Sequence, residues 1–283
     1  MNNLKTVALL GFLSALVVLV AQLFGLSAWA GLGIAAGLNL LMYFFSDRLA
    51  LSSSGARPVT EQQFPELYAI VRRLATAQGM PMPTVHYIDS PQPNAFATGR
   101  SPSRAAVVVT AGILQAMTPR ELEGVLAHEL AHVRNRDILI TTIAAVLAAA
   151  LSVFVRFGFF FGGRRDGSGN PVGAVLALAS IILAPIAAMI IRLAISRARE
   201  YEADASGARI TGEPLALASA LEKIGAASAR IPMNVNPAFA ELYIENPAKA
   251  VKRRGLSQLF STHPPIEDRI RRLREMALST GGR

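Results

Sequence analysis

The sequence from residue 119 to 134, PRELEGVLAHELAHVR, has the periodicity of an amphipathic helix. Thr118 precedes it as a residue that caps helix N-termini, and Pro119 suits the first helical position. Glu121 completes a capping box, because its side chain can accept a hydrogen bond from the Thr118 backbone amide. The stretch therefore predicts a helix that begins at Pro119 and ends near Arg134.

This helix contains the pattern His-Glu-x-x-His at His128, Glu129 and His132. Positions i and i+4 lie on one face of a helix, so both imidazoles can reach a single metal ion. Glu129 lies beside them, where a carboxylate can act as a general base towards water. The plainer alternative is an ordinary helix whose two histidines contact only solvent. Since the whole chain has four histidines, chance occurrence of this spacing is rare, and the pattern favours a metal site.

Composition narrows the class of protein. The chain has 283 residues, of which 52% are hydrophobic, and its mean hydropathy is +0.39. No cysteine is present, which excludes disulfides, thiolate zinc sites and cysteine nucleophiles. The formal charge of +9 could indicate nucleic-acid binding. The basic residues instead flank apolar blocks, as at the cytoplasmic face of a membrane protein, so no nucleic-acid partner is expected.

Four apolar runs are long enough to cross a bilayer, at residues 6–24, 26–45, 138–161 and 172–191. A cleaved signal peptide is the alternative for the first run. The second run follows almost at once, which favours a transmembrane hairpin. Four spans place both polar regions on one side, and the basic residues flanking that side outnumber those opposite: Lys5, Arg48, Arg134, Arg136, Arg192 and Arg197 against Arg164 and Arg165. This bias predicts that the polar regions are cytoplasmic.

The polar regions have helical and strand-like patterns. Helices are predicted at residues 63–78, 214–227 and 265–276, and short strands at 84–88, 94–98 and 105–110. A linker of small residues is expected at 51–57. The predicted fold is mainly α with a small β-sheet (α+β), in which a four-helix transmembrane region joins a domain that contains the histidine motif. Its parts are a hairpin (1–45), a first catalytic part (46–137), a second hairpin (138–191) and a second catalytic part (192–283).

A hydrolytic zinc site needs a third protein ligand. His86 and His263 are alternatives on chemistry alone. A glutamate from a later helix is the other common solution, and Glu200 is the candidate. Asp204 lies four residues later on the same helical face, where it could orient a ligand histidine. The plainer alternative is a solvated charged face, so the spacing alone leaves the third ligand open.

Four motifs together resemble those of the HtpX-type membrane zinc endopeptidases, a group related to the CAAX prenyl proteases and the mitochondrial Oma-type protease. They are His128-Glu129-Leu130-Ala131-His132, Arg199-Glu200-Tyr201-Glu202-Ala203-Asp204, Ser261-Thr262-His263-Pro264-Pro265 and Asn94-Ala95-Phe96-Ala97-Thr98-Gly99. The resemblance covers nearly the whole chain. It implies a zincin-like (gluzincin) catalytic domain and one zinc ion with Glu200 as third ligand. It also implies a multi-pass protein of the bacterial cytoplasmic (inner) membrane, with its active site on the cytoplasmic side, that degrades misfolded membrane proteins under stress.

The expected mechanism assigns further roles. Glu129 would accept a proton from the attacking water and return it to the leaving amine. His263 is the candidate donor to the oxyanion, although it could equally cap the helix that follows. Asn94, Ala95 and Phe96 resemble an edge strand to which an extended peptide could add.

Two other functions fit parts of the sequence. An intramembrane-cleaving metalloprotease would carry its histidine motif inside a hydrophobic span, whereas charged residues flank the motif here. A non-enzymatic zinc-binding membrane scaffold would not require Glu129, which is intact.

Overall fold

The computed structural model describes residues 2–23, 25–147, 196–236, 239–247 and 264–280. Within them, the helices are α1 (Asn2–Leu23), α2 (Ala28–Ser53), α3 (Pro65–Ala77), α4 (Ala111–Ala116), α5 (Pro119–Arg134), α8 (Arg197–Thr211), α9 (Pro214–Ser228) and α10 (Ile266–Thr280). The strands are β1 (Arg57–Pro58), β2 (Thr84–Ile88), β3 (Ala95–Gly99) and β4 (Ala105–Thr110), and two 3-10 turns are η1 (Pro102–Arg104) and η2 (Ala240–Leu242). A further helical segment spans Asp137–Leu147. The prediction of a mostly helical protein with a small sheet is confirmed.

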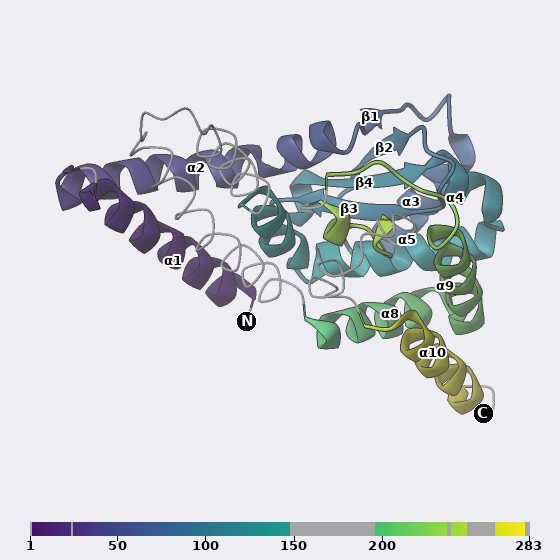
Figure 1. The fold of residues 1–283 in the computed structure, drawn as a ribbon. Helices are drawn as coiled ribbons and strands as arrows, with labels where there is room; N and C mark the ends of the chain where they lie inside the picture. Colours follow the sequence, from purple (N-terminus) through teal and green to yellow (C-terminus); the bar gives the residue numbers. More distant parts are fainter. Residues whose placement is uncertain (1, 24, 148–195, 237–238, 248–263, 281–283) are drawn as a thin grey trace, which may run out of the picture.

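Helices α1 and α2 pack side by side as a hairpin that projects from the rest of the protein (Figure 1). Gly25 makes the turn between them with a φ of +79°, a conformation that favours glycine. Ser27 caps α2 by accepting a hydrogen bond from the Ala30 amide at 3.2 Å. Between the helices, Asn39 Nδ2 donates to Ser14 Oγ at 2.8 Å, which fixes how they face each other.

Helix α2 is longer than its apolar sequence. It continues to Ser53, so the region from residue 51, predicted as a linker, begins as helix. The side chains of Asp47 and Arg48 lie at the helix surface, where charges end the apolar run without interrupting the backbone hydrogen bonds. The helix stops where Gly55 takes a φ of +70°.

Within the described part of the chain, α2 is the one helix that is long and apolar enough to cross a membrane. Most of its side chains are exposed. The prediction of four spans is therefore not confirmed. The third predicted span, 138–161, is helical in its described part, which ends at residue 147. The rest of that span and the whole fourth predicted span, 172–191, lie outside the described residues.

The four strands form a mixed sheet in the order β1-β2-β4-β3. β2 and β4 pair in parallel, while β1 and β3 join antiparallel at the two edges. The strands predicted at 84–88 and 105–110 have these bounds, and the one predicted at 94–98 is shifted by one residue. Strand β1 was not predicted, because two residues give no periodicity to detect.

Successive side chains of β3 and β4 point to opposite faces of the sheet, so they pack in two different hydrophobic cores. Ala97 and Val107 face the core beneath the sheet, which α3 and α5 fill. Phe96 and Val108 face the opposite side, where they pack with Tyr243. Helices α8 and α9 pack on α5, and α10 packs on α9 and α8, so the three helices continue the first core away from the sheet (Figure 1). Helix α5 is therefore the central element of the domain.

Candidate metal centre

Helix α5 places the histidine motif at the middle of this core. It begins with the predicted capping box, in which Thr118 Oγ1 accepts from the Glu121 amide at 3.3 Å and the Glu121 carboxylate accepts from the Thr118 amide at 2.8 Å. One turn separates His128 from His132, and their Nε2 atoms lie 3.2 Å apart. His128 is 1% exposed and Glu129 is 3% exposed, so the motif is buried.

Helix α8 brings Glu200 to the two imidazoles. Its Oε1 lies 3.4 Å from His132 Nε2, and its Oε2 lies 3.8 Å from His128 Nε2. Ligand atoms about 2.05 Å from a tetrahedral zinc ion are about 3.3 Å from one another, and the shortest distances between these three side chains, 3.2–3.8 Å, are close to that value. They form the group among the described residues that could hold a metal ion, and a His₂Glu donor set fits zinc.

A glycine allows the two helices to come this close. Gly207 of α8 lies against the α5 backbone, and a Cβ atom there would be 2.9 Å from the His128 amide nitrogen. Any larger residue would push α8 away from α5. Gly207 thus sets the distance between the helix with the histidines and the helix with Glu200.

A second carboxylate orients each histidine. Asp204 Oδ1 lies 2.9 Å from His128 Nδ1, and Asp137 Oδ2 lies 3.1 Å from His132 Nδ1. Each contact directs Nδ1–H to the carboxylate and leaves Nε2 for a metal. Asp204 was predicted in this position. Asp137 was missed, because it lies beyond the end of α5 and only the turn at Arg136, with a φ of +58°, folds it back to His132.

Arg269 of α10 is the other residue that the sequence analysis missed. Its side chain is 1% exposed and donates to Asp204 through Nε at 2.8 Å and Nη2 at 2.7 Å. The apolar stripe of α10 contains Ile266, Ile270 and Leu273, and Arg269 lies on the same helical face. The sequence signal that could have identified Arg269 is therefore its position on the apolar face of a predicted helix.

Burial shifts the protonation of these groups. It raises the pKa of Glu129 to about 7, with His132 opposing this shift and Glu200 adding to it. Burial, followed by the guanidinium of Arg269, lowers the pKa of His128 to about 4. His128 is thus neutral near pH 7, which is the form that binds metal ions. Burial alone would raise the pKa of Asp204, but Arg269 lowers it to about 2.

The edge strand β3 borders the site. The Ala97 amide donates to Glu129 Oε2 at 2.9 Å, which fixes the carboxylate beside the histidines. A small cavity of ≈ 30 Å³ lies over Ala97, Glu129 and the ligand side chains, and residues 241–244 form its opposite wall. That volume holds one or two water molecules.

Residues 240–246 also cover part of the β3 edge. The Ile244 amide donates to the Ala95 carbonyl at 2.9 Å, and Asn94 Nδ2 donates to the Glu245 carbonyl at 2.8 Å. Phe96 is fully buried against Tyr243, with ring centroids 4.7 Å apart. Substrate binding by Asn94, Ala95 and Phe96 therefore stays a prediction, and it requires residues 240–246 to move.

The remaining candidate residues do not join this centre. His86 on β2 contacts Thr84 and is not part of the group of metal-binding side chains. Glu202 is exposed, unlike Glu200 on the same helix. His263 lies outside the described residues, so its predicted role is untested.

A buried His-Glu-x-x-His helix beside a sheet edge, with a glutamate from a second helix, defines a protein of the metalloprotease class. The profile of peptidase family M48 matches residues 61–277. The chain is 49% identical to the protease HtpX homolog of Pelotomaculum thermopropionicum and 50% identical to that of Gemmatimonas aurantiaca; each match covers 98% of this chain and 100% of the relative. The chain belongs to peptidase family M48 and is a membrane-associated metalloprotease, which confirms the resemblance to the HtpX-type proteases.

A solved structure supports the fold. The crystal structure of S. mikatae Ste24p matches with a TM-score of 0.52 at 20% identity. The match covers 93% of this chain and 62% of the Ste24p chain.

Proposed function

We propose that His128, His132 and Glu200 bind one zinc ion and that Glu129 is the general base of peptide-bond hydrolysis. The observation that carries this proposal is the convergence of three ligand side chains, whose donor atoms approach one another to 3.2–3.8 Å, with the Glu129 carboxylate fixed beside them by the Ala97 amide. A zinc ion held by these three ligands would supply Lewis-acid activation of water and of the substrate carbonyl.

The chain's own residues would then handle protons and orientation. Burial favours the protonated form of the Glu129 carboxylate, which is the direction needed by a group that must accept a proton from water. Asp204 and Asp137 hold the two imidazoles so that neither ring can turn away from the metal. His263 remains our candidate for a hydrogen-bond donor to the developing oxyanion.

Substrate would bind at the edge of β3. Ala97 borders the cavity directly beside Glu129, so a peptide paired with the backbone at this residue would carry its carbonyl to the reacting groups. A cavity of ≈ 30 Å³ is too small for a peptide, so residues 241–244 must shift when substrate enters. Main-chain pairing gives little sequence specificity, which suits an endopeptidase that degrades misfolded proteins.

Single substitutions separate the two assigned roles. Glu129→Gln should retain zinc at about one ion per chain and lose proteolysis by several orders of magnitude, because only proton transfer is removed. Glu200→Ala should lose zinc on dialysis, whereas the exposed Glu202 gives a matched control in which Glu202→Ala keeps it. Equal zinc loss in the two alanine variants, or substantial turnover by Glu129→Gln, would overturn the assignment.

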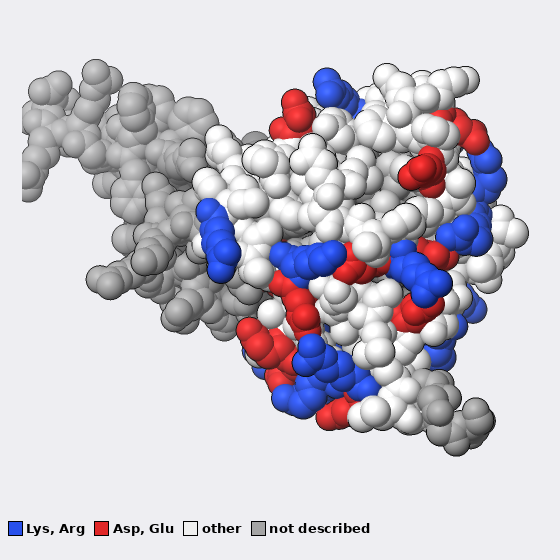
Figure 2. Space-filling model, turned by 90° about the vertical axis from the view of Figure 1, so that its right-hand side faces the viewer, with Lys and Arg blue, Asp and Glu red and all other residues white. Residues whose placement is uncertain are grey.

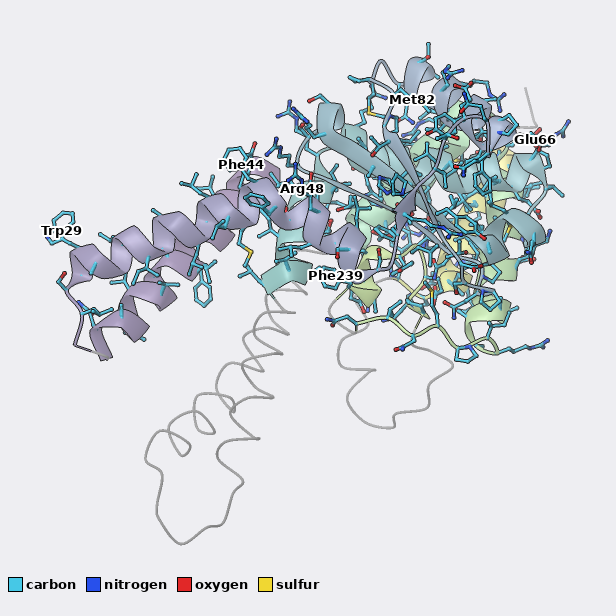
Figure 3. All side chains as sticks on the ribbon, turned by 90° about the horizontal axis from the view of Figure 1, so that it is seen from above. Trp29, Phe44, Arg48, Glu66, Met82 and Phe239 are labelled. Atoms are coloured by element: carbon cyan, nitrogen blue, oxygen red, sulfur yellow. The ribbon has the colours of Figure 1, made fainter. Side chains whose placement is uncertain are left out.

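The hairpin supports a position at a membrane surface. Trp29 lies at the far end of α2 and is 83% exposed, whereas Phe44 and Arg48 lie where α2 reaches the rest of the protein (Figure 3). At 1.5 Å per residue, Trp29 and Arg48 are about 28 Å apart, close to the thickness of a hydrocarbon core. The guanidinium of Arg100 lies 4.9 Å from the Phe44 ring centroid, a cation–π contact that joins α2 to the domain.

We further propose four transmembrane spans with the site on the cytoplasmic side of a bacterial inner membrane, and misfolded membrane proteins as substrates. The basic residues that flank the polar regions support this orientation. Acidic and basic residues are intermixed on the face shown in Figure 2, as on a water-exposed domain surface without a field of one sign.

Cysteine labelling tests the orientation, because the natural chain has no cysteine. In intact cells, an impermeant thiol reagent should label Ser168→Cys but not Ser103→Cys, which lies on the exposed turn η1. The reverse pattern would contradict the topology. Digestion of a misfolded membrane protein in detergent, with and without a chelator, tests the substrate class.

The location of the site disfavours intramembrane cleavage. Helix α5 lies between the sheet and helices α8 and α9 inside the globular domain, and Arg120 and Arg134 at its two ends are exposed. A site that cuts within the bilayer would lie inside a hydrophobic span instead.

A further inference from the structure

Arg269 is the most deeply buried cation that the structure describes, and it lies at the metal centre. Arginine is rarely buried completely unless a partner compensates its charge. On the same helix, Arg271 and Arg274 have side chains that are 61% and 60% exposed and form ion pairs at the surface. Arg269, with 1% of its side chain exposed, therefore has a different role from its neighbours.

Its guanidinium lies within hydrogen-bonding distance of three parts of the protein, and Nη1 is also 4.0 Å from Glu200 Oε2. Nε and Nη2 bind the two oxygens of Asp204, 65 residues away, at 2.8 and 2.7 Å. Nη1 donates to the Ile244 carbonyl at 3.1 Å. Nη2 also lies 3.4 Å from both ring nitrogens of His128, which places the guanidinium against the imidazole edge. A planar group with five N–H donors fixes all three partners in one geometry.

These partners are the parts of the site that need orientation. Asp204 can hold the His128 ring only if its own carboxylate is held, and the two parallel hydrogen bonds from Arg269 leave it no freedom to rotate. Ile244 belongs to the wall of the active-site cavity, and its amide pairs with the Ala95 carbonyl of β3. One side chain thus joins helix α10, the histidine ligand and the cavity wall.

We propose that Arg269 is a positioning residue of the metal centre. It orients His128 through Asp204, and through the Ile244 carbonyl it holds the cavity wall of residues 241–244 opposite strand β3. The inference rests on the proposed function, since it assumes that His128 is a metal ligand. It assigns to the C-terminal helix a direct part in building the site, in addition to its part in the hydrophobic core.

Zinc affinity of the full-length protein in detergent, measured by competition with a chromogenic chelator, tests the first half of this proposal. Removing such a support typically weakens metal binding 10- to 100-fold. We expect about 100-fold for Arg269→Gln and about tenfold for Arg269→Lys, which keeps the charge but cannot bind both oxygens of Asp204. Arg271→Gln is the matched control on the same helix and should stay within about twofold of wild type.

A double variant distinguishes positioning from general stability. If Arg269 acts through Asp204, the pair Asp204→Asn with Arg269→Gln should bind zinc no more weakly than Asp204→Asn alone. Losses that multiply would overturn the proposal. So would a lower Tm of the metal-free Arg269→Lys protein with unchanged zinc affinity, because a purely structural residue gives that result.

Hydrogen exchange tests the second half. The Ile244 amide should exchange faster in Arg269→Lys than in Arg271→Gln, because its segment loses an anchor. An unchanged rate would contradict the role in the cavity wall. If the wild-type protein binds no zinc, the proposed function itself is wrong. If the wild-type protein binds zinc and both Arg269 variants bind it with the same affinity, only this inference is wrong.

Discussion

Replacing Gly207 by alanine tests how closely the two ligand-bearing helices must approach. The new Cβ would lie 2.9 Å from the His128 amide nitrogen and 3.3 Å from the His128 Cα. Ordinary contacts of this kind begin near 3.4 Å, so the helices must separate by about 0.5 Å at their crossing. Neither partner atom belongs to a flexible side chain, and the backbone itself has to move.

Two effects on stability nearly cancel. Overpacking a helix contact costs about 1–3 kcal/mol, whereas alanine is more favourable than glycine inside a helix by about 1 kcal/mol. The net loss of unfolding free energy is about 1 kcal/mol, equivalent to a decrease in Tm of about 3 °C for a domain of this size. The effect on the metal is larger, because ligand distances tolerate only about 0.2 Å and Glu200 lies on the displaced helix, two turns before Gly207. We expect zinc affinity to fall about tenfold.

Chelator competition and thermal unfolding of the same preparation give both quantities. Gly225→Ala on α9 is the control, since its Cβ would meet Ile266 Cδ1 at 3.0 Å, the far end of a side chain that can turn aside. It should keep wild-type zinc affinity. Normal zinc binding by Gly207→Ala would refute the reasoning that this glycine sets the ligand spacing.

Substitutions at three further positions test contacts outside the group of metal-binding side chains. Asn94→Ala leaves the buried Glu245 carbonyl without its donor, so the unfolding free energy measured with denaturant should fall by about 2–3 kcal/mol; a loss below about 0.5 kcal/mol would show that the contact is dispensable. Arg136→Gly suits a φ of +58° and should stay within about 1 kcal/mol of wild type, whereas Arg136→Val should lose about 2 kcal/mol, and equal stability of the two would disprove strain there. Burial raises the pKa of Glu121, but hydrogen bonds from Lys223 and other donors lower it to about 2, below its ordinary 4.5. The ionised group therefore contributes stability above pH 4.5, about 2 kcal/mol after allowance for solvent screening, and this is lost as the pH falls towards 2. The Tm difference between wild type and Glu121→Gln should be full at pH 7 and should vanish near pH 2; a difference that does not depend on pH would contradict the assignment.

Local signals in the sequence were sufficient for several elements. Helix α5 has the predicted bounds, because its capping box and the spacing of its apolar residues act within a few residues. In α3, Leu67, Ile70, Val71 and Leu74 are buried, as their helical period requires. The end of α2 was not predictable from hydropathy, since charged side chains at the surface of a helix leave its backbone unchanged.

By itself, the sequence determined that one helix presents His128 and His132 on a single face with Glu129 beside them, since a 3.6-residue repeat fixes that arrangement wherever the helix lies. Spacing along the chain left His86, His263 and Glu200 as alternatives for the third ligand, and only the resemblance to known proteases favoured Glu200. Only the tertiary structure placed Glu200 with the histidines, 68 residues after His132, because that proximity depends on how closely Gly207 lets α8 approach α5. The same holds for Asp137 and Arg269, which reach the site through a turn and a buried helix face rather than through any spacing along the chain. Contacts between distant residues are set by the packing of whole elements, and no local pattern encodes them.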